Sequence, residues 1–293
     1  MYASYWKLTE KPFEDRLTSR FYYPSSTHQT ALLKILYAIE NRREVVVLCG
    51  PSGVGKSLVQ DQLRAQLPEF VGPVISLPYP DLDRDQLLAY LAMQLSDGAD
   101  QQQTSPALSI RQIESAIRRA SLAKKQILLL IEEAEWMEAR GGFEALRLLL
   151  NLAKIPAKAP VSKDTAEGNA DESSTGQTGL TILMNGQPSL LPQLERQVSF
   201  NQRIAARCIL NRFNVEETYS YITHRLRAAG GSADQIFESA AIDSIHFLTD
   251  GVPRRINNLC DMLLMVGYAQ ESQKISASMV EEVHRDLTPV YAS

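Results

Sequence analysis

The chain has 293 residues, of which 44% are hydrophobic and 22% are charged, and its formal net charge is −4. These values are typical of one large or two modest globular domains, and they give no sign of a general attraction to nucleic acid. The three cysteines and four histidines lack the spacing of a zinc site or a disulfide framework, so we interpret the histidines as ordinary surface or interior side chains. The sequence shows neither the layout of a signal peptide nor about 20 consecutive apolar residues, and it predicts a cytoplasmic protein.

The segment that starts at Val45 carries the most specific motif of the chain. The run "VVVLC" predicts a buried parallel strand, and the residues after "GKS" have the apolar spacing of a helix. Between them, "GPSGVGKS" fits the phosphate-loop pattern G-x-x-x-x-G-K-[ST] in full and in the strand–loop–helix context that the motif needs. The alternative is a glycine turn that binds no ligand. The residues expected to bind a nucleotide are Gly50, Pro51, Ser52, Gly53, Val54, Gly55, Lys56, Ser57 and Leu58.

The residue types of this loop explain its expected chemistry. Glycines let successive backbone N–H groups turn toward anionic oxygens, and the N-terminus of a helix adds a partial positive charge. Lys56 would bind the β- and γ-phosphates, and the Ser57 hydroxyl would bind Mg²⁺. The sequence therefore predicts ATP with Mg²⁺ as the ligand.

A second apolar strand ends at two acidic residues. Residues 127–131 are apolar throughout, and Glu132 and Glu133 follow them directly. Because ligands of open α/β sheets bind beyond the carboxyl ends of the strands, we expect Glu133 to polarise the attacking water and Glu132 to lie near Mg²⁺ through its water shell. The alternative is a solvated acidic helix start, which the helix dipole favours. Aspartate is usual at the position of Glu132, so ATP binding is a safer prediction than fast hydrolysis.

Strands and helices alternate along most of the chain. Further strands are predicted in "GPVISL", from Leu180 to Met184 and in "CILNRF". This alternation predicts an α/β fold, a P-loop NTPase with a parallel sheet sandwiched by helices. Residues 155–179 are rich in small and acidic residues and are expected to form a disordered surface insertion, or alternatively a functional loop. From residue 212 onward only helices are predicted, which make a small four-helix lid. The expected domains are an N-terminal arm with its leading helix at 1–44, a P-loop core at 45–211 and the lid at 212–293.

Together these pieces resemble an AAA+ ATPase, and within that group the ExeA/GspA type that is associated with secretion and pilus systems. The resemblance covers nearly the whole chain and rests on "YWKLTEKPF", "NGQPSLL", "QRIAAR" and "GVPRRIN" as well as on the phosphate loop. Family members with a secretion role often continue into a membrane segment and a peptidoglycan-binding domain. This chain ends at Ser293 with neither, so we expect a truncated form, a stand-alone form or another branch.

The resemblance implies roles for further polar residues. Asn185 or Gln187 would be the first sensor, a polar side chain near the γ-phosphate, and Arg254 would be the second sensor, which binds the nucleotide from the lid. Arg203 or Arg207 would be the arginine finger that neutralises charge at a neighbouring subunit's site. Five residues of the N-terminal arm would line the base pocket, namely Phe21, Tyr22, Tyr23, Ser26 and Thr27. Alternatively, the three aromatic residues would pin the arm.

Three functions remain open from the sequence. The first is an oligomeric, ATP-hydrolysing switch that self-associates through the nucleotide site and serves protein partners in assembly of a secretion or pilus apparatus. The second is an ATP-dependent DNA-binding regulator, similar to the transposition ATPases of the TnsC/TniB type, with the basic helix "SIRQIESAIRRASLAKK" as a DNA contact. The third is a nucleotide-binding switch that hydrolyses ATP very slowly. In each, we expect ATP to lie between the sheet and the lid.

Overall fold

The computed structural model describes residues 2–14, 19–96, 105–154 and 178–287. Contacts within the chain divide it into two compact units. The sheet unit comprises Thr30–Gly50 and Val59–Ile209, and the loop-and-lid unit comprises Met1–Gln29, Pro51–Leu58 and Leu210–Ser293. The phosphate-loop motif thus belongs, by its contacts, with the N-terminal arm and the C-terminal helices. The domain bounds expected from the sequence, 1–44, 45–211 and 212–293, stay predictions.

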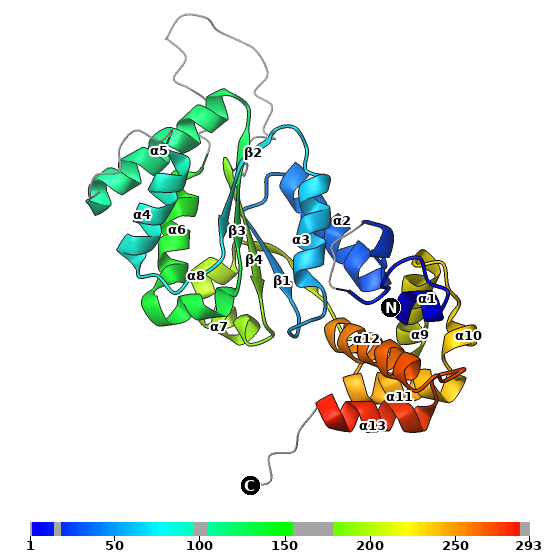
Figure 1. The fold of residues 1–293 in the computed structure, drawn as a ribbon. Coiled ribbons are helices and arrows are strands. Elements are labelled where there is room, and N and C mark those ends of the chain that lie inside the picture. Colours follow the sequence, from blue (N-terminus) through cyan, green and yellow to red (C-terminus); the bar gives the residue numbers. More distant parts are fainter. Residues whose placement is uncertain (1, 15–18, 97–104, 155–177, 288–293) are drawn as a thin grey trace, which may run out of the picture. The chain divides into compact units, whose positions relative to one another are not determined.

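In the described part of the chain the sheet has five parallel strands in the order β2-β3-β4-β1-β5 (Figure 1). Strands β1, β3 and β4 are buried along their whole length, which fits their largely apolar sequences. The predicted α/β fold with a parallel sheet is confirmed. The strands are β1 Val45–Cys49, β2 Val71–Leu77, β3 Gln126–Ile131, β4 Leu180–Gly186 and β5 Ile204–Ile209.

The last strand differs from its prediction. We expected it at 208–213, but β5 covers Ile204–Ile209 and pairs with β1 from Val45 opposite Ile204 to Cys49 opposite Ile209. As an edge strand β5 has one neighbour, and its side chains alternate between more and less exposed positions. Its sequence "IAARCI" therefore lacks the continuous apolar run that identifies the buried strands.

Helices cover both faces of the sheet: α4, α5 and α6 lie on one side and α3 on the other (Figure 1). Helix α4 begins with a capping box, in which the side chains of Asp83 and Gln86 each accept from the other residue's backbone N–H. Helix α5 begins with a Ser105 cap followed by a proline. Helices α2 and α3 each begin in the loop-and-lid unit and continue in the sheet unit. The bounds are α2 Ser26–Glu40, α3 Lys56–Ala65, α4 Arg84–Leu95, α5 Pro106–Leu122, the 3₁₀ helix η2 Ala134–Arg140, α6 Gly142–Leu152, α7 Leu190–Arg196 and α8 Val198–Asn201.

The loop-and-lid unit joins the N-terminal arm to the lid helices in one apolar core. Trp6 donates from its indole nitrogen to the Leu264 carbonyl at 2.9 Å, and the Arg225 guanidinium donates to the carbonyls of Pro12 at 2.6 Å and Glu14 at 2.9 Å. The four predicted lid helices are present, with one additional short helix, α10. The bounds are α1 Tyr2–Tyr5, the 3₁₀ helix η1 Ser19–Phe21, α9 Val215–Ala228, α10 Ala233–Ile236, α11 Ser239–Thr249, α12 Pro253–Ala269 and α13 Ala277–Leu287.

Two further expectations concern the predicted insertion and the absence of a membrane-spanning segment. The predicted insertion at 155–179 lies outside the described residues, apart from Thr178 and Gly179. Within the described ranges, every helix is too short or too polar to cross a bilayer.

Candidate nucleotide-binding site

The phosphate loop has the local geometry that its sequence predicts. The buried strand β1 ends at Cys49, and α3 begins at Lys56. Between them, Gly53 has φ +83° and Gly55 has φ +97°, a backbone region that side chains other than glycine rarely adopt. The Lys56 ammonium donates to the Pro51 carbonyl at 3.1 Å, so the lysine side chain folds back over its own loop. We expect a loop with this backbone to form a nest for phosphate oxygens.

The lid contacts this loop at the start of α12. The Arg254 N–H donates to the Gly53 carbonyl at 3.2 Å, while the Arg254 side chain is exposed. The first N–H groups of a helix have no partner within it, and here one of them bonds to the loop. A Cβ atom added to Gly53 would lie 3.0 Å from both Arg254 Cβ and Val252 Cγ1. The predicted second sensor thus lies against the loop through its backbone.

The N-terminal arm contacts the same loop through His28, a residue for which the sequence suggested no role. His28 Nε2 lies 2.9 Å from the Val54 carbonyl, and Nδ1 is hydrogen-bonded to the Ser25 hydroxyl. Burial lowers the pKa of His28, and a nearby Glu217 carboxylate and the bond to Val54 oppose this effect only in part. The sequence pattern could not have identified this contact, because Val54 is 26 residues away in the chain.

The aromatic residues of the arm pack on the lid, as the pinning alternative predicts. Tyr23 makes edge contacts with Phe213 and Tyr221, at ring-centre distances of 5.8 Å and 5.7 Å. The Arg225 guanidinium lies over the Phe21 ring, 5.0 Å from its centre. The geometry therefore supports the pinning role for Phe21 and Tyr23.

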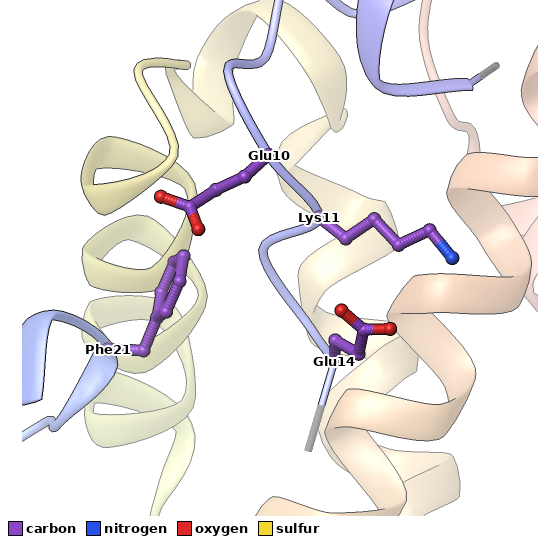
Figure 2. A pocket seen from close by; sticks show the side chains of 4 residues that line it. All are labelled: Glu10, Lys11, Glu14 and Phe21. Atoms are coloured by element: carbon purple, nitrogen blue, oxygen red, sulfur yellow. The ribbon is translucent and has the colours of Figure 1, made fainter. Parts of the chain in front are cut away.

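A separate hollow of about 230 Å³ lies in the arm, lined by Glu10, Lys11, Glu14 and Phe21. In Figure 2 the Phe21 ring points toward the Glu10 carboxylate, and the Lys11 side chain extends away from both. Glu10 pairs with Arg20 at 2.7 Å, and the Lys11 ammonium lies over the Tyr2 ring. Glu10 and Lys11 thus interact with other residues of the arm, and none of the residues that line the hollow belongs to the phosphate-loop motif.

In the sheet unit, two predicted site residues meet at the carboxyl ends of β3 and β4. The Asn185 amide donates from Nδ2 to Glu132 Oε2 at 2.6 Å. Burial raises the pKa of Glu132, and the amides of Gln60 and Asn185 and the charge of Arg64 oppose the shift. Gln187 is exposed, two residues beyond Asn185. Of the two candidates for the first sensor, Asn185 is the one in contact with an acidic residue of the predicted metal side.

Glu133 follows at the turn that leads into η2. Its φ is +47°, an uncommon value for a residue with a side chain, so the backbone is held in a strained conformation there. Glu135 lies two residues further on, and its Oε2 accepts from the Gln187 N–H at 3.1 Å. Burial raises the pKa of Glu135, and the neighbouring Glu133 raises it further. Sequence reasoning missed Glu135, although its place two residues after Glu133 was a cue.

The two arginine-finger candidates differ in their surroundings. Arg203 is largely buried, with its guanidinium 3.1 Å from the Glu44 carboxylate and 2.5 Å from Asn151 Oδ1. Arg207 is exposed on the edge strand β5 and donates to Asn201. Arg203 therefore has structural partners within its own unit, whereas Arg207 is accessible.

Each unit contains residues that fit part of a Mg²⁺-bound nucleoside triphosphate. In the loop-and-lid unit, the glycine loop with Lys56 and Ser57 suits phosphate oxygens. In the sheet unit, Glu132 and Asn185 offer the oxygen ligands that Mg²⁺ prefers. Asn185 Oδ1 is buried and has no hydrogen-bond partner among the described residues, which fits an acceptor for a metal-bound water. In the part of the chain that the structure describes, no group of three or more histidine, cysteine or acidic side chains is placed to hold a metal ion.

A family model described as an AAA domain matches residues 39–194, more than half of the 293 residues. The chain belongs to the AAA family. This AAA protein is 29% identical over 290 residues to General secretion pathway protein A of Aeromonas hydrophila, a match that covers 98% of this chain. It spans only 47% of that relative's length. The predicted resemblance to AAA+ ATPases of the ExeA type is confirmed.

Solved structures agree with this fold. The ORC2 protein of Aeropyrum pernix, solved in ADPNP and ADP complexes, matches with a TM-score of 0.64 at 14% identity, over 94% of this chain and 71% of that one. Drosophila ORC bound to DNA matches with a TM-score of 0.63 at 14% identity, over 96% of this chain and 65% of that one. At these identities the likeness concerns the fold alone.

Proposed function

We propose that this AAA protein binds ATP at Gly50–Leu58 and uses its hydrolysis to switch between two states of an oligomer. The observation that carries the proposal is the backbone bond from Arg254, at the start of α12, to Gly53 of the phosphate loop. Any change of the loop on nucleotide binding would act on the lid through this bond. A nucleotide can bias the lid only by the difference in its affinity for two lid positions.

Each residue of the candidate site has a task in this proposal. Lys56 and the loop N–H groups bind the phosphates, and Ser57 with Glu132 would hold Mg²⁺, which neutralises phosphate charge when it is bound. Glu133 orients and polarises the attacking water. Asn185 fixes the Glu132 carboxylate and acts as the first sensor. The exposed Arg254 side chain acts as the second sensor.

A neighbouring copy of the chain would complete the site. Arg207 suits the arginine-finger role better than Arg203, because its guanidinium is exposed and a finger has to reach the nucleotide site of a neighbouring subunit. Arg203, by contrast, is bound to Glu44 and Asn151. Self-association through the nucleotide site is therefore part of the proposed mechanism.

We assign the switch to the assembly of a secretion or pilus apparatus. Support comes from the relative named General secretion pathway protein A, with which 98% of this chain aligns. Because the chain spans 47% of that relative, its protein partners in such a pathway belong to the proposal as well.

The test combines an assay of ATP turnover with measurement of the mass in solution by light scattering, without nucleotide and with ATP or ADP. The proposal predicts Mg²⁺-dependent phosphate release and a larger mass with ATP than with ADP. A Lys56→Ala variant is the control and should show neither effect. An unchanged mass in all three conditions, or the absence of phosphate release by the unaltered protein, would contradict the proposal.

A second candidate, ATP-dependent DNA binding, rests on the basic surface of α5 and the turn after it. The five basic side chains of this segment are all exposed, namely Arg111, Arg118, Arg119, Lys124 and Lys125. Fluorescence anisotropy of a duplex DNA at two salt concentrations, with and without ATP, tests this function. Binding that requires ATP and weakens steeply with salt would favour it, since contacts to phosphates release counterions. The absence of binding at low salt would exclude it.

A further inference from the structure

His28 is a buried polar residue that has no role in the function proposed above. It lies near the start of α2, its side chain is 2% exposed, and both ring nitrogens have hydrogen-bond partners. One partner is Ser25 in the arm, and the other is the Val54 carbonyl of the phosphate loop. The residue therefore connects the arm directly to the loop that is expected to bind phosphate.

The direction of these bonds follows from the chemistry of their partners. A carbonyl oxygen only accepts, so His28 Nε2 carries the proton and donates it to Val54. Nδ1 of the neutral ring is then an acceptor, and the Ser25 hydroxyl donates to it. Burial lowers the pKa of His28, which favours this neutral form. Ser25 thus fixes the tautomer that the bond to the loop requires.

The bond to Val54 sets the direction of a phosphate-binding N–H group. The peptide between Val54 and Gly55 is planar and trans, so its carbonyl and its N–H point in opposite directions. With the carbonyl held by His28, the Gly55 N–H faces away from the ring. The preceding peptide is held in the same way, because the Arg254 N–H bonds to the Gly53 carbonyl and thereby orients the Val54 N–H.

The His28 ring also lies directly against the glycine of this peptide. A Cβ atom added to Gly55 would lie 2.8 Å from His28 Nε2, much closer than a normal contact. Gly55 has φ +97°, so the ring supports a backbone conformation that only glycine adopts readily. Contact with the ring and the hydrogen bond act on the same peptide.

We propose that His28 is a positioning residue for the phosphate loop, which holds the Val54–Gly55 peptide so that its N–H group is directed to bind a nucleotide phosphate. This inference rests on the proposed function, because it assumes that the loop binds ATP. In this view the loop has two carbonyl anchors, His28 from the arm and the N-terminus of α12 from the lid. The arm is therefore part of the nucleotide-binding apparatus, although it need not contact the nucleotide.

Two substitutions separate positioning from ordinary structural support. In His28→Gln, the side-chain amide nitrogen reaches about as far as Nε2 and can still donate to Val54. In His28→Asn, the amide ends near the place of Nδ1 and leaves the Val54 carbonyl without its donor. Both variants are uncharged and both lose the ring. A difference between them therefore reports the bond to the loop.

The experiment measures ATP affinity by titration calorimetry in the presence of Mg²⁺, with thermal unfolding of each nucleotide-free variant recorded alongside. We expect His28→Asn to weaken ATP binding about tenfold, because the Val54–Gly55 peptide loses the hydrogen bond that holds its orientation. His28→Gln should restore most of that loss. Because Val54 keeps its donor only in His28→Gln, His28→Asn should unfold at a somewhat lower temperature, and both variants should be folded at the temperature of the titration. ADP, which also places a β-phosphate in the loop, should follow ATP.

A lid histidine on another helix is the control. His284 is partly buried on α13, whereas the loop bonds to the start of α12, so His284→Asn should leave ATP affinity unchanged. Equal affinities of the Asn and Gln variants at position 28 would overturn the inference while leaving the proposed function intact. Absence of ATP binding by the unaltered protein would instead refute the proposed function. Should His28→Asn not fold, Ser25→Ala provides the second test, and unchanged ATP affinity in it would also overturn the inference.

Discussion

Two buried polar clusters, one in each unit, differ in how completely their hydrogen bonds are satisfied. In the loop-and-lid unit, both ring nitrogens of His28 are bonded, to Ser25 and to Val54 of the phosphate loop. In the sheet unit, Asn185 donates to Glu132, but its carbonyl oxygen Oδ1 has no hydrogen-bond partner in the described ranges. The loop is thus supported before any ligand binds, whereas the acidic cluster keeps acceptors for a ligand.

From this difference we infer that the loop-and-lid unit mainly determines the affinity for the nucleotide and that the sheet unit mainly determines the rate of its hydrolysis. Substitutions around the loop should change nucleotide binding first, and substitutions around the acidic cluster should change turnover first.

Exchange of the exposed arginine of β5 should have the largest effect on turnover. Arg207→Ala should reduce ATP hydrolysis about 1,000-fold with little change in ATP affinity, because a finger acts on the transition state of a neighbouring site. In contrast, Arg203→Ala should lower the free energy of unfolding by about 1 kcal/mol, since it breaks a partly buried ion pair. Specific activity of the unaltered protein should rise with its concentration. Strictly linear turnover with protein concentration would contradict a shared site.

Loss of the water-activating carboxylate should come next. Glu133→Gln should still bind ATP but hydrolyse it at least about 100-fold more slowly, because a general base contributes a factor of about this size or more. Glu114→Gln, an exposed change on α5, is the matched control and should hydrolyse ATP at the normal rate. Single-turnover phosphate release measures both. Normal turnover by the Glu133 variant would remove this residue from the mechanism.

A methyl group added to the phosphate loop should weaken ATP binding without changing the acidic cluster of the sheet unit. Gly55→Ala should weaken ATP binding about tenfold, because the new Cβ meets His28 at 2.8 Å and the residue has φ +97°. Gly141 has φ +72° with open space at the Cβ position, so Gly141→Ala imposes backbone strain without a clash. Calorimetry should show unchanged ATP affinity in this control. Similar losses of affinity in both variants would show that general strain, not the loop, is responsible.

The pH dependence of stability should be the smallest effect. Burial lowers the pKa of His28 in the folded protein, so the unfolded chain binds more protons in the weakly acidic range. The stability that neutral His28 contributes is therefore fully present above the pKa that this histidine has in the unfolded chain, and it is lost as the pH falls below about 6.5. The melting temperature should fall between about pH 7.5 and about pH 5.5, and fall less in His28→Gln, which cannot be protonated. A nearby Glu217 carboxylate reduces the effect, and parallel pH profiles of the two proteins would refute it.

Contiguous motifs were predictable from the sequence, and contacts between distant segments were not. The phosphate loop and β3 were recognised because their residues stand together and their strands are apolar throughout. The edge strand β5 was misplaced because alanines and an arginine interrupt its apolar pattern. His28 was interpreted as an ordinary histidine, since its partner Val54 lies far along the chain and leaves no spacing to detect. Arg203 and Arg207 looked alike in sequence, and only burial and the partners of Arg203 separate them.

We propose above that the loop from Gly50 to Leu58 binds ATP with Mg²⁺. This proposal is tested most directly by calorimetric titration of the unaltered protein and the Lys56→Ala variant with ATP and Mg²⁺. We predict saturable binding by the unaltered protein and an affinity at least about 100-fold lower in the variant, because the lysine supplies the positive charge for the β- and γ-phosphates. Equal binding isotherms for the two proteins would contradict the claim.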